Sequence, residues 1–266
     1  MKPAPFRYQA ASSLDGALAL LGEEDAKALA GGQSLVPLLN FRLARPSLLV
    51  DLNPVVELAY LRRSDGVLRI GALTRQVRLE RSALVQRGWP LLCQAVGMVG
   101  HPAIRCRGTV GGSVAHADPS AELPVALAAL DARFHLRSPR GERTVGAAEL
   151  FRGPMMTTIE ANELLVEIEV PAPPPEARMA FVEHARTHGD FALAGAAVVV
   201  APGEHAAIAL LGAGPTPVRA VAAEQALLRG ASATEAAALA GEAVRDEYRR
   251  ALVTEMVRRA LEQAGA

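Results

Sequence analysis

Cysteine is scarce in this sequence, with only Cys93 and Cys106 among 266 residues. Two thiols are too few for a four-cysteine zinc or iron–sulfur site, so any such centre must lie on another chain. The spacing of the two residues permits a disulfide. Free thiols are nevertheless the more common state of so few cysteines in a chain without secretory features, and we expect them here.

The sequence also lacks a long hydrophobic run and an excess of one charge. The longest apolar run, residues 191–201, is too short to cross a bilayer, and residues 1–13 have no apolar core typical of a secretory signal. The 28 Lys and Arg residues balance the 28 Asp and Glu residues. This balance indicates no general attraction to nucleic acids or anionic membranes. We expect a cytoplasmic protein without a membrane span and without a nucleic-acid partner.

Aromatic residues make up only 4% of the chain, although 50% of its residues are hydrophobic. Alanine supplies much of this hydrophobic content, which predicts an ordered core of closely packed small side chains and excludes general disorder. The length allows one large domain or two to three small ones.

The most informative motif lies at residues 107–124, RGTVGGSVAHADPSAELP. Gly108, Gly111 and Gly112 can adopt positive φ and have no Cβ, so successive N–H groups can converge on an anion. The apolar run after Glu122 predicts a helix whose N-terminus lies just downstream of the glycines, an arrangement typical of phosphate binding. The alternative for a single glycine pair is a tight connection between a strand and a helix.

A second stretch, residues 28–43, repeats this design in the sequence ALAGGQSLVPLLNFRL. A short apolar strand leads into Gly31 and Gly32, and a helix-like apolar segment follows Ser34. Two backbone cradles in one chain suit a ligand with a diphosphate between two bulky ends.

Both stretches resemble the signatures of the FAD-binding medium subunit of the molybdenum hydroxylases, the xanthine dehydrogenase and carbon monoxide dehydrogenase family. Residues 189–195, GDFALAG, and 248–261, YRRALVTEMVRRAL, resemble the C-terminal domain of the same family. The resemblance implies noncovalent FAD and electron relay between iron–sulfur centres on a partner and an external acceptor.

The resemblance also implies cofactor-binding positions in both glycine segments. We call residues 30–35 the first segment and residues 108–113 the second segment. N–H groups of the first segment and the Ser34 hydroxyl would hold the diphosphate, and the second segment would run along the flavin side. Asp118 and Glu122 would accept hydrogen bonds from ribose, ribityl or adenine groups, with helix capping as the alternative. Leu165 matches a position that packs on the cofactor and is otherwise a core leucine. The implied set is Ala30, Gly31, Gly32, Gln33, Ser34, Leu35, Thr109, Gly111, Gly112, Ser113, Asp118, Glu122 and Leu165.

We expect no catalytic residue and no metal ligand in this chain. His116 has two alternative roles, a covalent flavin link or a general base, but the family holds FAD noncovalently and oxidises its organic substrate elsewhere. His184 and His188 have the spacing of metal ligands on a helix, whereas their segment is expected to be strand and turn.

The expected fold is α+β, with a two-subdomain FAD-binding domain of the PCMH type and a small C-terminal domain. The subdomains are assigned to residues 1–54 and 55–172. Residues 176–266 are assigned to a three-stranded antiparallel sheet with a helical bundle, after a proline-rich linker. Local patterns predict a helix capped by Ser13, a helix capped by Thr74, and a hairpin turn at residues 141–143.

The resemblance further implies two partners, a small [2Fe–2S] subunit and a large molybdopterin subunit, in a dimer of heterotrimers. Two alternatives are a stand-alone PCMH-type flavin oxidoreductase and a non-redox structural subunit of the same assembly. The absence of a large substrate-capping domain argues against the first, and the intact glycine segments argue against the second.

Overall fold

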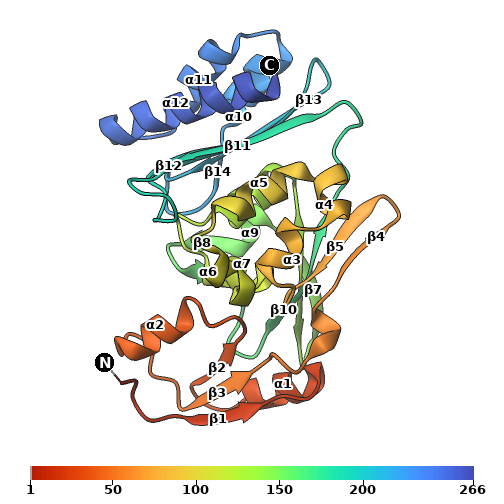
Figure 1. Cartoon of the computed structure of the whole chain (residues 1–266), viewed down its shortest axis with the longest axis vertical. Coiled ribbons are helices and arrows are strands. Elements are labelled where there is room, and N and C mark those ends of the chain that lie inside the picture. Colours follow the sequence, from red (N-terminus) through yellow and green to blue (C-terminus); the bar gives the residue numbers. More distant parts are fainter. Residues whose placement is uncertain (1) are drawn as a thin grey trace.

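The computed structural model describes residues 2–266 and stacks three main sheets along its longest axis. The N-terminal sheet lies at one end, a five-stranded sheet with its helices lies in the middle, and a four-stranded sheet under three helices lies at the other end (Figure 1). This mixed helix and sheet architecture is the α+β fold that the sequence predicts.

The N-terminal unit is a parallel three-stranded sheet in the order β1-β3-β2. Helix α1 follows β1 and covers the sheet, because Leu14, Leu18 and Leu21 lie on one buried face. As predicted, Ser13 caps α1: its Oγ accepts a hydrogen bond from the N–H of Gly16 at 3.1 Å. The elements are β1 (Arg7–Ala10), α1 (Leu14–Leu21), β2 (Ala26–Leu29), α2 (Leu35–Asn40) and β3 (Leu48–Asp51).

The middle unit is an antiparallel sheet in the order β4-β5-β10-β6-β7. Ile70, Phe134 and Ile168 project from it into a core shared with the helices. The strands are β4 (Leu61–Ser64), β5 (Val67–Gly71), β6 (Arg133–Ser138), β7 (Gly141–Gly146) and β10 (Leu164–Val170), with a small hairpin of β8 (Phe151–Gly153) and β9 (Met156–Thr157). The helices are η1 (Val56–Leu58), α3 (Gln76–Glu80), α4 (Ala83–Gly88), α5 (Pro90–Met98), α6 (Pro102–Arg107), α7 (Val110–His116), α8 (Glu122–Ala129) and α9 (Ala147–Leu150).

Two local predictions in this unit are wrong. Residues 141–143 belong to β7, and the turn precedes them, because Ser138 pairs with Gly141 and closes a two-residue hairpin loop. Thr74 does not cap a helix. Its hydroxyl is buried and donates to the carbonyl oxygen of Tyr60 at 2.7 Å, so the N-cap position of α3 falls to Arg75.

The C-terminal unit is an antiparallel sheet in the order β11-β12-β13-β14. The three expected strands are present, and the two-residue strand β14 extends the edge by pairing with β13. Every residue of β12 is buried, since helices cover both faces of the sheet. The elements are β11 (Arg178–His184), β12 (Ala194–Ala201), β13 (His205–Leu211), β14 (Val218–Arg219), α10 (Val221–Leu228), α11 (Ala233–Gly241) and α12 (Glu247–Ala264).

Helix α8 is buried along its whole length because it packs between the middle unit and the C-terminal sheet. The two units therefore share one hydrophobic core, which includes Leu127 of α8 and Val199 of β12. Trp89 adds a polar tie at the linker by donating its Nε1 hydrogen to the carbonyl oxygen of Pro171 at 2.7 Å. The division into residues 1–54, 55–172 and 176–266 stays a prediction: each range carries its own sheet, but the core crosses the second boundary.

Candidate functional site

The two glycine segments lie against each other where the N-terminal and middle units meet (Figure 1). A Cβ placed on Gly31 would overlap the carbonyl oxygen of Arg107 and lie 2.8 Å from the Cα of Gly108. A Cβ on Gly112 would lie 3.8 Å from the Cβ of Ala30. Segments about eighty residues apart in the chain therefore form one site, and glycine at position 31 permits the close approach.

The first segment presents five consecutive N–H groups, from Gly31 to Leu35, that have no hydrogen-bond acceptor among residues 2–266. The Ser34 hydroxyl likewise makes no capping bond. These donors are free because β2 has ended at Leu29 and α2 begins only at Leu35, so they include the unpaired N–H groups of a helix start. Gly32, at φ 77°, turns the chain between the two elements. Such a run of free donors fits an anion.

The N–H groups of the second segment already donate to acceptors within the chain. Thr109 caps α7 and accepts the N–H of Gly112 at 3.1 Å, while Gly111 donates to Ala72 at 2.9 Å and Ser113 to the Thr109 carbonyl at 3.1 Å. The expectation that these N–H groups converge on an anion is therefore wrong. Residues 108–111 are buried, Gly112 and Ser113 are partly exposed, and the free donors come from the first segment.

The helix predicted for the apolar run after Glu122 is present as α8, but a further helix, α7, precedes it. Gly111 lies inside the first turn of α7, and a separate helix, α8, begins at Glu122. A Cβ on Gly111 would lie 2.6 Å from the Cβ of Ala72, so glycine here allows α7 to pack against the end of β5. Sequence analysis missed α7 because two glycines in seven residues weaken the helical signal. The Thr109 cap and tertiary packing compensate for this weakness.

Asp118 and Glu122 have different environments. The Oδ1 of Asp118 accepts the N–H of Ser120 at 2.8 Å, which closes the turn before α8. Glu122 is 8% exposed and its carboxyl group has no hydrogen-bonding side chain beside it; burial raises its pKa to about 7. Glu183 of β11 is a second carboxyl group nearby: burial and then the charge of Glu122 raise its pKa to about 8. No motif marks Glu183, and only the fold shows the two together.

His116 is the last residue of α7, the helix that follows Thr109. Burial lowers its pKa, while the charge of Asp118 opposes this shift and the charge of Lys27 adds to it. Leu165 near the start of β10 is 6% exposed and belongs to the main core. Its contact with a cofactor stays a prediction.

Sequence analysis missed a polar relay that joins the two segments. Arg75 donates from Nη2 to the Oδ1 of Asn53 at 2.6 Å and from Nη1 to the carbonyl oxygen of Arg107. Asn53 in turn donates from Nδ2 to the carbonyl oxygen of Ala30 at 3.1 Å. Isolated arginine and asparagine residues carry no motif, so the sequence alone contains no signal for this relay.

A cluster with metal-ligand spacing occurs elsewhere, on the middle sheet. Ligand atoms of His135, Glu167 and Glu169 lie within 4.8 Å of one another. Arg69 contacts both carboxylates from Nη1, at 2.6 Å and 3.0 Å. Arg62 also contacts Glu167, at 3.3 Å, so two arginines balance the two carboxylates. We interpret the cluster as an ion-pair network across four strands.

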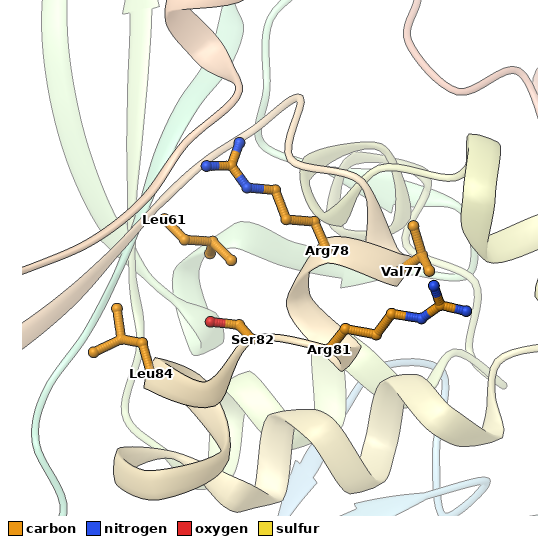
Figure 2. A pocket seen from close by; sticks show the side chains of 6 residues that line it. All are labelled: Leu61, Val77, Arg78, Arg81, Ser82 and Leu84. Atoms are coloured by element: carbon orange, nitrogen blue, oxygen red, sulfur yellow. The ribbon is translucent and has the colours of Figure 1, made fainter.

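Two surface hollows, of about 440 and 460 Å³, lie outside the glycine segments. In the first, Arg78 of α3 lies near Leu61 of β4, and Arg81, which follows α3, extends beside Val77 (Figure 2). It is lined by Leu61, Val77, Arg78, Arg81, Ser82 and Leu84. The second lies along the proline-rich linker. Neither contains a residue of the predicted cofactor site.

The helices of residues 2–266 include none that combines the length and the apolar character needed to cross a bilayer.

Known proteins are similar in sequence to this chain over nearly its whole length. The family model described as the FAD binding domain in molybdopterin dehydrogenase matches residues 4–173. The 6-hydroxypseudooxynicotine dehydrogenase complex subunit alpha of Paenarthrobacter nicotinovorans is 45% identical over 283 residues, with 99% of this chain and 96% of the relative covered. The carbon monoxide dehydrogenase medium chain of Hydrogenophaga pseudoflava is 39% identical over 284 residues, with 100% and 99% covered.

Solved structures have the same architecture. A chain of carbon monoxide dehydrogenase from Hydrogenophaga pseudoflava superposes with a TM-score of 0.94 at 41% identity, covering 100% of this chain and 99% of that chain. A chain of quinoline 2-oxidoreductase from Pseudomonas putida 86 gives a TM-score of 0.93 at 37% identity, covering 100% and 99%.

Proposed function

Because this chain belongs to the family of FAD-binding domains of molybdopterin dehydrogenases, we propose that it holds FAD noncovalently at the junction of its two glycine segments. The chain is an FAD-dependent oxidoreductase subunit of the molybdenum hydroxylase type, and it transfers electrons within a heterotrimeric assembly. Substrate oxidation takes place on the large subunit.

The observation that carries the location is the run of five unpaired N–H groups from Gly31 to Leu35. This run fits a diphosphate, since consecutive backbone donors and a helix start both favour anions. We assign the diphosphate to Ala30 and these five residues, with the Ser34 hydroxyl as a further donor. The assigned set is Ala30, Gly31, Gly32, Gln33, Ser34 and Leu35.

The flavin side of the cofactor is assigned to the second segment. Gly112 and Ser113 are partly exposed there, whereas Thr109 and Gly111 are buried and fix the start of α7 beneath them. Glu122 offers a carboxyl group without a side-chain partner. Asp118 and Leu165 complete the proposed set. FAD, when bound, supplies a flavin that exchanges electrons singly or in pairs, so it couples one-electron centres to a two-electron acceptor.

The relatives are named as subunits of complexes, and this chain is one subunit of a multi-subunit enzyme. We propose that its partners are a small [2Fe–2S] subunit and a large molybdopterin subunit, in a dimer of heterotrimers. The two cysteines support an external source of iron–sulfur electrons, because Cys93 and Cys106 are both free and too few for a cluster. We also propose a cytoplasmic location, in keeping with these free thiols.

The experiment is an absorption spectrum of the purified chain after incubation with FAD and desalting, repeated on the supernatant after acid precipitation. We expect a bound flavin spectrum whose colour moves completely to the supernatant. Colour that stays in the pellet would indicate a covalent flavin and the stand-alone oxidoreductase alternative. A colourless chain, both alone and after reconstitution with its partner subunits, would indicate a non-redox structural subunit.

A further inference from the structure

We propose that Arg75 is a positioning residue for the cofactor, which fixes the first glycine segment against the second. The proposal rests on FAD binding at this junction and adds a residue from outside both motifs. Arg75 is the N-cap residue of α3, and its hydrogen bonds place its side chain at the junction.

The side chain bridges the two segments by hydrogen bonds at both ends of its guanidinium group. One nitrogen binds the carbonyl oxygen of Arg107, immediately before the second segment. Another binds Asn53, whose amide holds the carbonyl oxygen of Ala30, immediately before the five free N–H groups. A planar guanidinium can hold two acceptors in fixed directions, whereas a lysine ammonium acts as a point charge.

The partners of Arg75 are themselves held in place. The Oδ1 of Asp51 accepts the N–H of Asn53 at 2.9 Å, and its Oδ2 accepts the Tyr8 hydroxyl at 2.5 Å. On the other side, the N–H of Gln76 donates to the carbonyl oxygen of Gly108 at 2.9 Å. The relay therefore connects backbone of the N-terminal sheet to backbone of the middle unit.

The charge of Arg75 also suits an anionic cofactor. Within residues 2–266, neither Arg75 nor Arg107 forms an ion pair with a carboxylate within 4.0 Å. Burial lowers the pKa of Arg75 and the charge of Arg107 lowers it further, while the charge of Asp51 opposes both effects. Two guanidinium groups and five free N–H groups therefore lie near the assigned diphosphate, and the single carboxylate of Asp51 offsets only part of their positive charge.

The test measures FAD affinity by flavin fluorescence titration of the full chain carrying Arg75→Gln, Arg75→Lys or Asn53→Ala. Arg78→Gln is the matched control, because Arg78 lies one turn further along α3 and donates to the carbonyl oxygen of Ala59 at 2.9 Å, in the hollow of Figure 2. Melting temperatures of all variants, and amide exchange of residues 108–111, are measured without FAD.

We expect Arg75→Gln and Asn53→Ala each to raise the FAD dissociation constant about tenfold. The double variant should bind no more weakly than Arg75→Gln, since both residues act in one relay. Arg75→Lys should restore less than half of the loss in binding free energy, and amide exchange at residues 108–111 should increase in the Arg75 variants. Arg78→Gln should stay within twofold of the wild type in both measurements.

Wild-type affinity in Arg75→Gln, or full rescue by lysine, would overturn the positioning role. If Arg75→Gln does not fold, Asn53→Ala alone decides, because it breaks the link to Ala30 and keeps the arginine. Absence of FAD binding by the wild-type chain, with or without partners, would instead refute the proposed function.

Discussion

Gly31 shows how a single residue controls the junction between the two segments. It has no positive φ, so its backbone would accept any residue, but its α-carbon lies against the backbone of Arg107 and Gly108. Backbone atoms cannot rotate out of the way as a flexible side chain can. The requirement for glycine therefore comes from the space between two segments.

We predict that Gly31→Ala will weaken FAD binding at least tenfold, because the added methyl group must push the segments apart. The measurement is the FAD dissociation constant from fluorescence titration. Gly97→Ala is the control, since a Cβ at Gly97 in α5 meets no atom within 4 Å, and alanine there should stabilise the helix by up to ~1 kcal/mol. Equal affinity of Gly31→Ala and the wild type would contradict the prediction.

Glu122 makes the stability of the FAD-free chain depend on pH. Its folded-state pKa, raised to about 7 from an ordinary value of 4.5, means that the folded state binds a proton more tightly than the unfolded state. The stability that this tighter proton binding adds to the folded state is therefore fully present below pH 4.5. It declines as the pH rises through 7 and is lost above it. Ionised Glu122 thus destabilises the fold in alkaline solution.

We predict that Glu122→Gln will raise the unfolding free energy of the FAD-free chain at pH 8, by ~3 kcal/mol at most, and change it little at pH 5. The measurement is urea unfolding of the variant and the wild type at both pH values. Glu204→Gln, at an exposed turn, is the control: its effect on the unfolding free energy should be the same at pH 5 and pH 8. The same gain at pH 5 and pH 8 would show that ionisation of Glu122 is not the cause.

At the scale of an element, α7 depends on its cap. The helix has only seven residues and begins with two glycines in its first three positions, so its intrinsic stability is low. The Thr109 hydroxyl compensates by accepting the N–H of Gly112.

We predict that Thr109→Ala will lower the unfolding free energy by ~1 kcal/mol and that Thr109→Ser, which keeps the hydroxyl group, will restore most of it. Denaturant unfolding measures both variants. Alanine and serine variants of equal stability would rule out the hydroxyl as the source of the effect.

Element boundaries were predictable where the signal was local. The Ser13 cap of α1 is the clearest case, because its hydroxyl binds an N–H group three residues away. Local patterns failed at Thr74 and α7, since pairing between chain segments distant in sequence decides both. Thr74 turns to the carbonyl oxygen of Tyr60, and α7 packs on Ala72.

At the scale of the whole molecule, the C-terminal sheet is joined to α8 by a shared core and by Arg219. This residue contacts Asp131 at 2.6 Å, the carbonyl oxygen of Ala128 at 3.1 Å, and buried Glu224 at 2.7 Å. Glu224 also accepts the N–H of Ile208 at 2.8 Å. Removal of the arginine would leave Glu224 buried without its counter-charge.

We predict that Arg219→Ala will lower the unfolding free energy by ~3 kcal/mol. Adding Glu224→Gln should recover part of the loss, because the unpaired charge is then gone.

Fluorescence of Trp89, the only tryptophan, and circular dichroism should report one coincident urea transition for the wild type, since the core crosses the linker. Separate transitions would show that the C-terminal unit unfolds alone.

The family, the cofactor class and the two glycine segments could be read from the amino-acid sequence alone, because they depend on residue types at short spacings. The folded chain was needed to show which N–H groups are free, that Glu122 and Glu183 lie together, and that Arg75 and Asn53 join the segments. Hydrogen-bond partners and burial depend on atoms contributed by distant parts of the chain. The spacing of residues within one segment therefore does not predict these partners or this burial.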